Sequence, residues 1–157
     1  MKKVLLAAVM AFAPSAALAD TQILTFTGTT TSFCDITVSS TGALTQSSDG
    51  TNLSTSNTGG SAASFSASTN TSSSVLDLDD AVTTTASPSG SSFTTTQAIS
   101  VTDPSSNSLY SGDGSGGASA TLVAGTNTGS VGLTVTASSG ALPVGNYSFS
   151  KTVTCTP

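Results

Sequence analysis

The feature that most constrains the fold is the alternation of apolar residues with small or polar ones along most of the chain. In the clearest stretch, Val131, Leu133, Val135 and Ala137 are separated by single glycine or threonine residues. Successive side chains of a β-strand point to opposite faces, so a period of two predicts strands with one face toward a core. No stretch after residue 19 shows the i, i+3, i+4 apolar spacing of an amphipathic helix. We therefore expect an all-β fold.

Eight windows carry this alternation and are expected to be strands: residues 24–26, 34–38, 65–67, 76–78, 99–101, 118–122, 131–137 and 147–155. Turn-forming residues separate them, for example in Asn127-Thr128-Gly129. Residues 103–117 form the longest expected loop. This spacing predicts an immunoglobulin-like β-sandwich of about seven to nine short strands, as a single domain over residues 20–157.

The first 19 residues have the pattern of a secretory signal peptide. Two lysines precede an apolar run of about ten residues, which is too short to cross a bilayer. Ala17-Leu18-Ala19 then forms a cleavage site of the A-x-A type. The alanine-rich signal is of bacterial type, and no later segment is apolar for long enough to span a membrane. The mature chain is therefore expected to be secreted, either extracellular or periplasmic, at the bacterial cell surface, without a membrane span.

Two cysteines, Cys34 and Cys155, remain after the predicted cleavage. Export would bring both into an oxidising compartment, and two cysteines allow only one disulfide. Such a bridge would close a loop of nearly the whole domain, for which the chain-entropy model gives about 4–5 kcal/mol of stabilisation. Two free buried thiols are the main alternative, and a metal site is a further one. The bridge is our prediction.

Cleavage would also remove most of the positive charge. The sequence has three Lys and Arg residues, eight acidic residues and no His, and Lys151 is the only cation outside the signal. Because binding to nucleic acid depends on neutralising phosphates, a single cation excludes that function. The mature chain also lacks His, Glu and Arg, which supply most general acids, bases and oxyanion-binding groups. We expect no enzymatic activity and no cofactor.

Lys151 is difficult to place in the predicted pattern. It shares its parity with Phe149 and Val153, whose side chains should point inward. A buried, unpaired ammonium is costly. A β-bulge could shift the register, the side chain could reach the edge of the sheet, or it could pair with an aspartate.

The tightest acidic cluster consists of Asp77, Asp79 and Asp80. Carboxylates are hard oxygen ligands, so the cluster is a weak candidate for a calcium site. The spacing of an EF-hand is absent, however. In an alternating strand, Asp77 and Asp79 would lie on the face opposite Leu76 and Leu78. We therefore expect these carboxylates to be solvated, with no bound metal.

Two segments resemble known families. Residues 23–36, ILTFTGTTTSFCDI, are similar to the opening of bacterial fimbrial subunits, in which an alternating strand and a Phe-x-Gly step precede a cysteine. Residues 142–149, LPVGNYSF, are similar to the step before the last strand of pilins and of spore-coat-U-like secreted domains. If such subunits exchange strands, the resemblance implies that Leu24 and Phe26 are the anchors of the donated strand. The alternative is a self-completed sandwich, in which a Cys34–Cys155 bond joins the first and last strands. The resemblance also implies self-association or binding to other surface subunits.

These observations favour a secreted structural protein of the cell surface, a fimbria-like or pilin-like subunit without catalytic activity. The alternative is a secreted adhesin, a module that binds glycans or another surface partner. Such modules usually expose aromatic platforms, and the two tyrosines, Tyr110 and Tyr147, are the only candidates for this role. Tyr147 is expected to be buried, whereas Tyr110 could either pack on the domain or be exposed.

Overall fold

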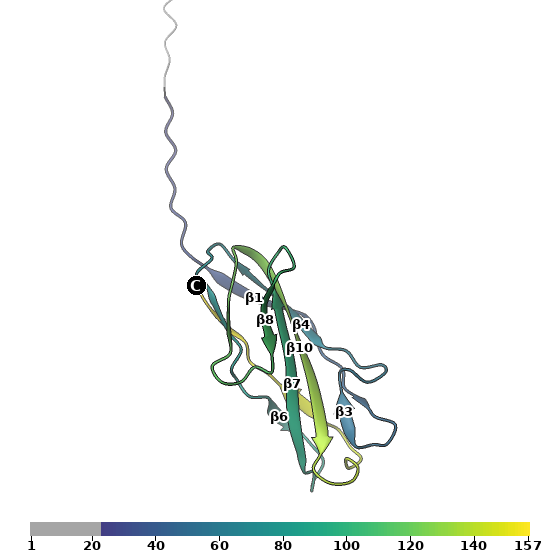
Figure 1. Cartoon of the computed structure of the whole chain (residues 1–157). Coiled ribbons are helices and arrows are strands. Elements are labelled where there is room, and N and C mark those ends of the chain that lie inside the picture. Colours follow the sequence, from purple (N-terminus) through teal and green to yellow (C-terminus); the bar gives the residue numbers. More distant parts are fainter. Residues whose placement is uncertain (1–22) are drawn as a thin grey trace, which may run out of the picture. The chain divides into compact units, whose positions relative to one another are not determined.

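The computed structural model describes residues 23–157 (Figure 1). The predicted signal peptide and its cleavage after Ala19 lie outside these residues. Residues 23–157 contain strands in antiparallel pairs and no helix, so the all-β prediction is confirmed. It follows that this part of the chain has no helix suited to crossing a membrane.

The described residues form twelve strands. In chain order they are β1 (Cys34–Ser40), β2 (Thr45–Gln46), β3 (Asn52–Ser54), β4 (Ala63–Thr69), β5 (Val75–Asp77), β6 (Thr83–Ala86), β7 (Phe93–Thr102), β8 (Ser108–Gly112), β9 (Ser119–Thr121), β10 (Gly125–Ala137), β11 (Ser148–Ser150) and β12 (Thr154–Thr156). The number exceeds the expected seven to nine for two reasons. The short strands β2, β3, β6 and β8 fall outside the alternating windows, and the last window is divided into β11 and β12.

Seven strands form the main sheet, in which β10 is central. One edge of β10 pairs with β7 over ten residues, and the two long strands lie side by side in Figure 1. The other edge pairs with β4 along its first half and with β3 along its second half. β1 extends the sheet beside β4, β2 lies beside β3, and β8 lies beside β7.

The remaining strands form two smaller sheets. One has the order β12–β5–β9, and the other consists of β11 and β6. Residues 151–153, between β11 and β12, belong to no strand. The C-terminal segment, defined here as residues 147–156, therefore pairs first with β6 and then with β5.

The hydrophobic core contains residues of both the main sheet and the three-stranded sheet. Ala67, Ile99 and Val101 come from the main sheet, and Leu76 and Ala120 come from β5 and β9; each of the five is at most 2% exposed. Leucine, isoleucine, valine and alanine dominate because only 5% of the residues are aromatic. The inward positions alternate along each strand, as the period of two predicts.

Phe65 is the aromatic residue of this core, and Gly129 makes room for it. The two residues are paired in the ladder between β4 and β10. A Cβ atom built on Gly129 would lie 2.1 Å from Cζ of the Phe65 ring, far inside van der Waals contact. The ring can therefore lie against β10 only where that strand has no side chain.

Hydroxyl side chains on the main sheet pair across neighbouring strands. The oxygens of Thr102 and Thr128 are 2.9 Å apart, as are those of Ser100 and Ser130. Cross-strand hydroxyl pairs of this kind stabilise sheets modestly. Many of the Ser and Thr residues on these strands occupy exposed or half-buried positions that alternate with the core residues, whereas Ser54 and Thr69 are buried.

Two predictions of irregular structure are wrong. The expected loop at residues 103–117 contains β8, which pairs with β7. The expected turn at Asn127-Thr128-Gly129 lies inside β10. Asparagine and glycine favour turns when only local conformation is considered. At both places the pairing with neighbouring strands overrides that preference.

The strand expected at residues 24–26 is also absent. Residues 23–33 form no strand, and the compact unit of the structure begins at Thr31. An alternating sequence becomes a strand only where another strand completes its backbone hydrogen bonds. Residues 24–26 have no such partner among the described residues.

Candidate functional site

An apolar groove of about 800 Å³ lies next to Phe65. One of its walls is formed by residues of β1, β4 and β10, and the other by the C-terminal segment. The larger aliphatic and phenylalanine side chains that line it are Ile36, Val38, Leu44, Phe65, Val82, Val131, Leu133, Phe149 and Val153. A volume of this size is typical of binding cavities. The lining suits a partner with apolar side chains.

Two strand edges beside the groove have no partner within residues 23–157. β1 pairs only with β4, and β11 pairs only with β6. No ladder of hydrogen bonds therefore joins β1 to the C-terminal segment in this part of the chain. Val38 is 70% exposed as a result, and Ile36, Val131 and Leu133 are only partly buried. Unpaired strand edges next to uncovered apolar residues form a template for an added strand.

The N-terminal arm, defined here as residues 20–33, precedes β1 and is described from residue 23 onward. Its apolar side chains are largely uncovered, since Ile23 is 88%, Leu24 80% and Phe26 90% exposed. Leu24 and Phe26, the predicted anchors of a donated strand, have the same parity. The last residues of the arm, 31–33, already belong to the compact unit: the Asn70 side chain accepts from the Phe33 N–H and donates to the Thr31 carbonyl.

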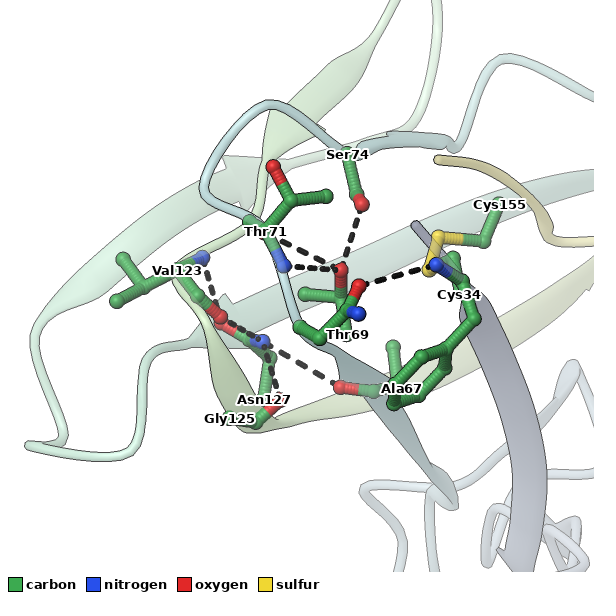
Figure 2. The surroundings of a disulfide bond; sticks show 11 residues. Cys34, Ala67, Thr69, Thr71, Ser74, Val123, Gly125, Asn127 and Cys155 are labelled. Carbon is green, nitrogen blue, oxygen red and sulfur yellow. Dashed lines mark hydrogen bonds between the residues drawn. A yellow bond between two sulfur atoms is a disulfide. The ribbon is translucent and has the colours of Figure 1, made fainter. Parts of the chain in front are cut away.

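A disulfide joins Cys34 to Cys155, as predicted (Figure 2). The Cα atoms of the two residues are 5.9 Å apart, within the usual range for disulfides. The alternatives of free thiols and a metal-bound cysteine are therefore excluded for this pair. The bond joins the first residue of β1 to β12. It fits a protein of an oxidising compartment.

Near the disulfide, buried polar side chains form hydrogen bonds with one another or with the backbone (Figure 2). The hydroxyls of Thr69 and Ser74 are 2.7 Å apart. The fully buried Asn127 amide donates to the carbonyls of Val123, Gly125 and Ala67, and its oxygen accepts from the Val123 N–H. Asn127 thereby fixes the chain just before β10, and it has a structural role that its sequence context did not indicate.

Lys151 lines the groove, and its ammonium group donates to the backbone carbonyls of Leu78, at 2.7 Å, and of Asp80. In the ladder between β11 and β6 the register shifts between Ser148 and Phe149, close to Lys151. A register shift was one of the three explanations expected for the position of Lys151. Burial lowers the pKa of Lys151 below its usual value, and the charges of Asp80, Asp79 and Asp77 act in the opposite direction. The inward parity of Lys151 is thus accommodated by carbonyl oxygens of residues 78–80.

The acidic cluster lies on the exposed side of this region. Asp77, Asp79 and Asp80 are exposed, whereas Leu76 and Leu78 are fully buried, as the alternation predicted. The Asp77 carboxylate accepts a hydrogen bond from the Asp79 N–H. Within residues 23–157, no group of three or more acidic, Cys or His residues is arranged to hold a metal ion.

Asp49 is expected to make the stability of the fold dependent on pH at acidic values. Hydrogen bonds from the Ser47 hydroxyl and from the Thr51 N–H and hydroxyl lower the pKa of Asp49 from 3.8 to about 2. Because the folded-state pKa is the lower one, the carboxylate contributes fully above pH 3.8, and this contribution is lost as the pH falls toward 2.

Asp49→Asn is therefore expected to lose less stability than the wild type on acidification through this range. Urea unfolding at a series of pH values would measure the two slopes. Ser47→Ala, which removes only the hydrogen bond with the largest effect, should give an intermediate slope. Equal slopes for the wild type and Asp49→Asn would show that Asp49 is not responsible.

The two tyrosines are both partly buried. Tyr110 packs against the core, and its hydroxyl accepts from the Gly114 N–H, so the packed alternative is the observed one. Tyr147 borders a second, smaller pocket of about 290 Å³. Its ring meets Phe93 edge to face, and its hydroxyl donates to the Pro143 carbonyl. Neither tyrosine is a free aromatic platform of the kind expected for a glycan-binding module.

Some residues of the groove could not be recognised from the sequence. Leu44 and Val82 lie outside the alternating windows, in segments rich in glycine, serine or aspartate. An isolated apolar residue in such a segment is only a weak signal of burial. Ile36, Val131 and Leu133, by contrast, were expected to be inward-facing strand residues, and they line the groove.

Comparison with known proteins gives no relative: no protein-family model, no curated protein and no solved structure matches this chain.

Proposed function

We propose that this chain is an exported structural subunit of the bacterial cell surface. In this proposal its compact unit is an immunoglobulin-like β-sandwich that lacks one strand, and the N-terminal arm of a second copy supplies it. The supporting observation is that one chain carries both an uncovered apolar groove and an uncovered arm with alternating apolar residues. Apolar surface exposed to water is unfavourable in both the groove and the arm. The apolar side chains of the arm match the apolar lining of the groove.

The energetics favour such an exchange. Full burial of a leucine or phenylalanine side chain stabilises by about 1.5–3 kcal/mol, and both Leu24 and Phe26 are available for it. An inserted strand would also form backbone hydrogen bonds with the unpaired edge of β1 or of β11. Because the groove and the arm are different surfaces, the contact is head-to-tail and can be repeated from copy to copy.

The arm variant Leu24→Asp/Phe26→Asp tests this function. The wild type, exported and oxidised, is expected to form a series of oligomers in size-exclusion chromatography and in unheated gel electrophoresis. The variant should be monomeric, because a carboxylate buried in an apolar groove is strongly unfavourable.

The matched control is Thr25→Asp/Thr27→Asp, which adds the same charge to the same arm on the opposite face. It should retain the oligomers. A monomeric wild type would contradict the proposed function. Loss of oligomers only in the control would show that the other face of the arm docks, and that Leu24 and Phe26 are not the anchors.

A further inference from the structure

We infer that the Cys34–Cys155 disulfide acts as a redox gate on the groove, so that a strand can dock only after the bond has formed. The inference rests on the proposed function and adds a condition to it.

The position of the bond carries the argument. Cys34 begins β1, and Ile36 and Val38, a few residues later, line one wall of the groove. Cys155 lies in β12, and Val153, two residues earlier, lines the other wall. Both walls thus lead away from the same covalent bond. The disulfide lies where the walls converge, and it fixes the distance between them at that point.

No backbone pairing duplicates this connection in the described part of the chain. β1 belongs to the main sheet and pairs only with β4, whereas β12 belongs to the three-stranded sheet and pairs only with β5. The ladder between β1 and β4 is also irregular, with a register shift between Val38 and Ser40. Without the bond, β1 is an edge strand held along one side, and such strands are prone to local opening.

Opening of β1 would act on the groove rather than on the whole core. The residues of β1 are half-buried or exposed, whereas the fully buried residues lie in β4, β5, β7, β9 and β10 or adjoin them. Moving β1 removes the wall formed by Ile36 and Val38 and leaves these core residues in place. A reduced chain would therefore keep its core and lose its docking site, which would confine assembly to an oxidising compartment.

The experiment uses the full chain with Leu24→Asp/Phe26→Asp, so that its own arm cannot occupy a groove. The probe is a fluorescently labelled peptide of residues 20–33, and fluorescence anisotropy measures its binding. The oxidised protein is compared with the reduced protein and with a Cys34→Val/Cys155→Val variant. Circular dichroism and NMR establish the folding of each form. The two forms without the bond are expected to stay folded. Their affinity for the peptide should be lower than that of the oxidised form by a factor of about ten or more.

A further form of the protein tests whether the covalent connection itself, and not another effect of the reductant, determines binding of the peptide. A short bis-alkylating reagent joins the two reduced thiols by a bridge that reductant cannot cleave, and this form should bind the peptide even in the presence of reductant. Equal affinity of the folded reduced and oxidised forms would overturn the inference. So would a reduced chain that is unfolded even in stabilising sucrose, because the bond would then be needed by the whole domain. If no form binds the peptide, the proposed function itself fails.

Discussion

Replacing Asn127 by leucine is expected to lower the free energy of unfolding by about 3 kcal/mol or more. The leucine side chain has a similar size, so the change removes hydrogen bonds without creating a large cavity. It leaves the carbonyls of Val123 and Gly125 and the N–H of Val123 without the partner they have in the folded chain. Asn127 is fully buried, so water cannot replace the amide without rearrangement.

Urea unfolding at neutral pH, followed by circular dichroism, measures this loss. Asn146→Leu is the matched control, because Asn146 is exposed and precedes β11. The control should change stability by less than about 0.5 kcal/mol. If Asn127→Leu were as stable as the control, the hydrogen bonds of Asn127 would have no net stabilising effect.

A second large effect is expected from Gly129→Ala, at about 2–3 kcal/mol of lost stability. The cause is steric, because the new Cβ would lie 2.1 Å from the Phe65 ring. The backbone of Gly129 is in an ordinary strand conformation, so alanine adds no backbone strain there. In a strand without this contact, replacing glycine by alanine would be neutral or favourable.

A double-mutant cycle identifies the ring as the cause. Phe65→Leu removes part of the aromatic side chain and should itself destabilise the fold, by leaving space in the core. If Gly129→Ala clashes with the ring, the double variant should be more stable than the sum of the two single changes predicts. Simple additivity would show that Gly129 is required for another reason.

The fold class could be predicted from the sequence because side-chain alternation and strand geometry have the same period. Ile99 and Val101, or Leu76 and Leu78, are buried where that period places them. Asn127 shows where this reasoning ends. Its local context, Asn-Thr-Gly, is typical of a turn, but its conformation is decided by pairing with residues about sixty positions earlier in β4. Such long-range pairing cannot be read from neighbouring residues.

The groove was less predictable than the disulfide. Two cysteines permit one bond, so the pairing of Cys34 with Cys155 followed from the count alone once oxidation was assumed. A groove, in contrast, depends on which strands pair with one another and which edges stay unpaired. The alternation at residues 24–26 predicts a strand equally well whether its partner lies in the same chain or in a second copy. What the sequence does not show is that β1 pairs only with β4 and β11 only with β6 within residues 23–157.

The pairing of β12 with β5 has a consequence for how the chain folds. Cys155 is opposite Leu76 in that ladder, and β10 likewise pairs with β3, more than seventy positions earlier. Folds built from such distant pairs reach the native state slowly, in milliseconds to seconds, because long loops must close before the contacts stabilise them. Until β12 arrives, β5 lacks one neighbour and Cys34 lacks its partner thiol. In the folded chain the Cys34–Cys155 bond thus accompanies a long-range strand pairing rather than a local structure.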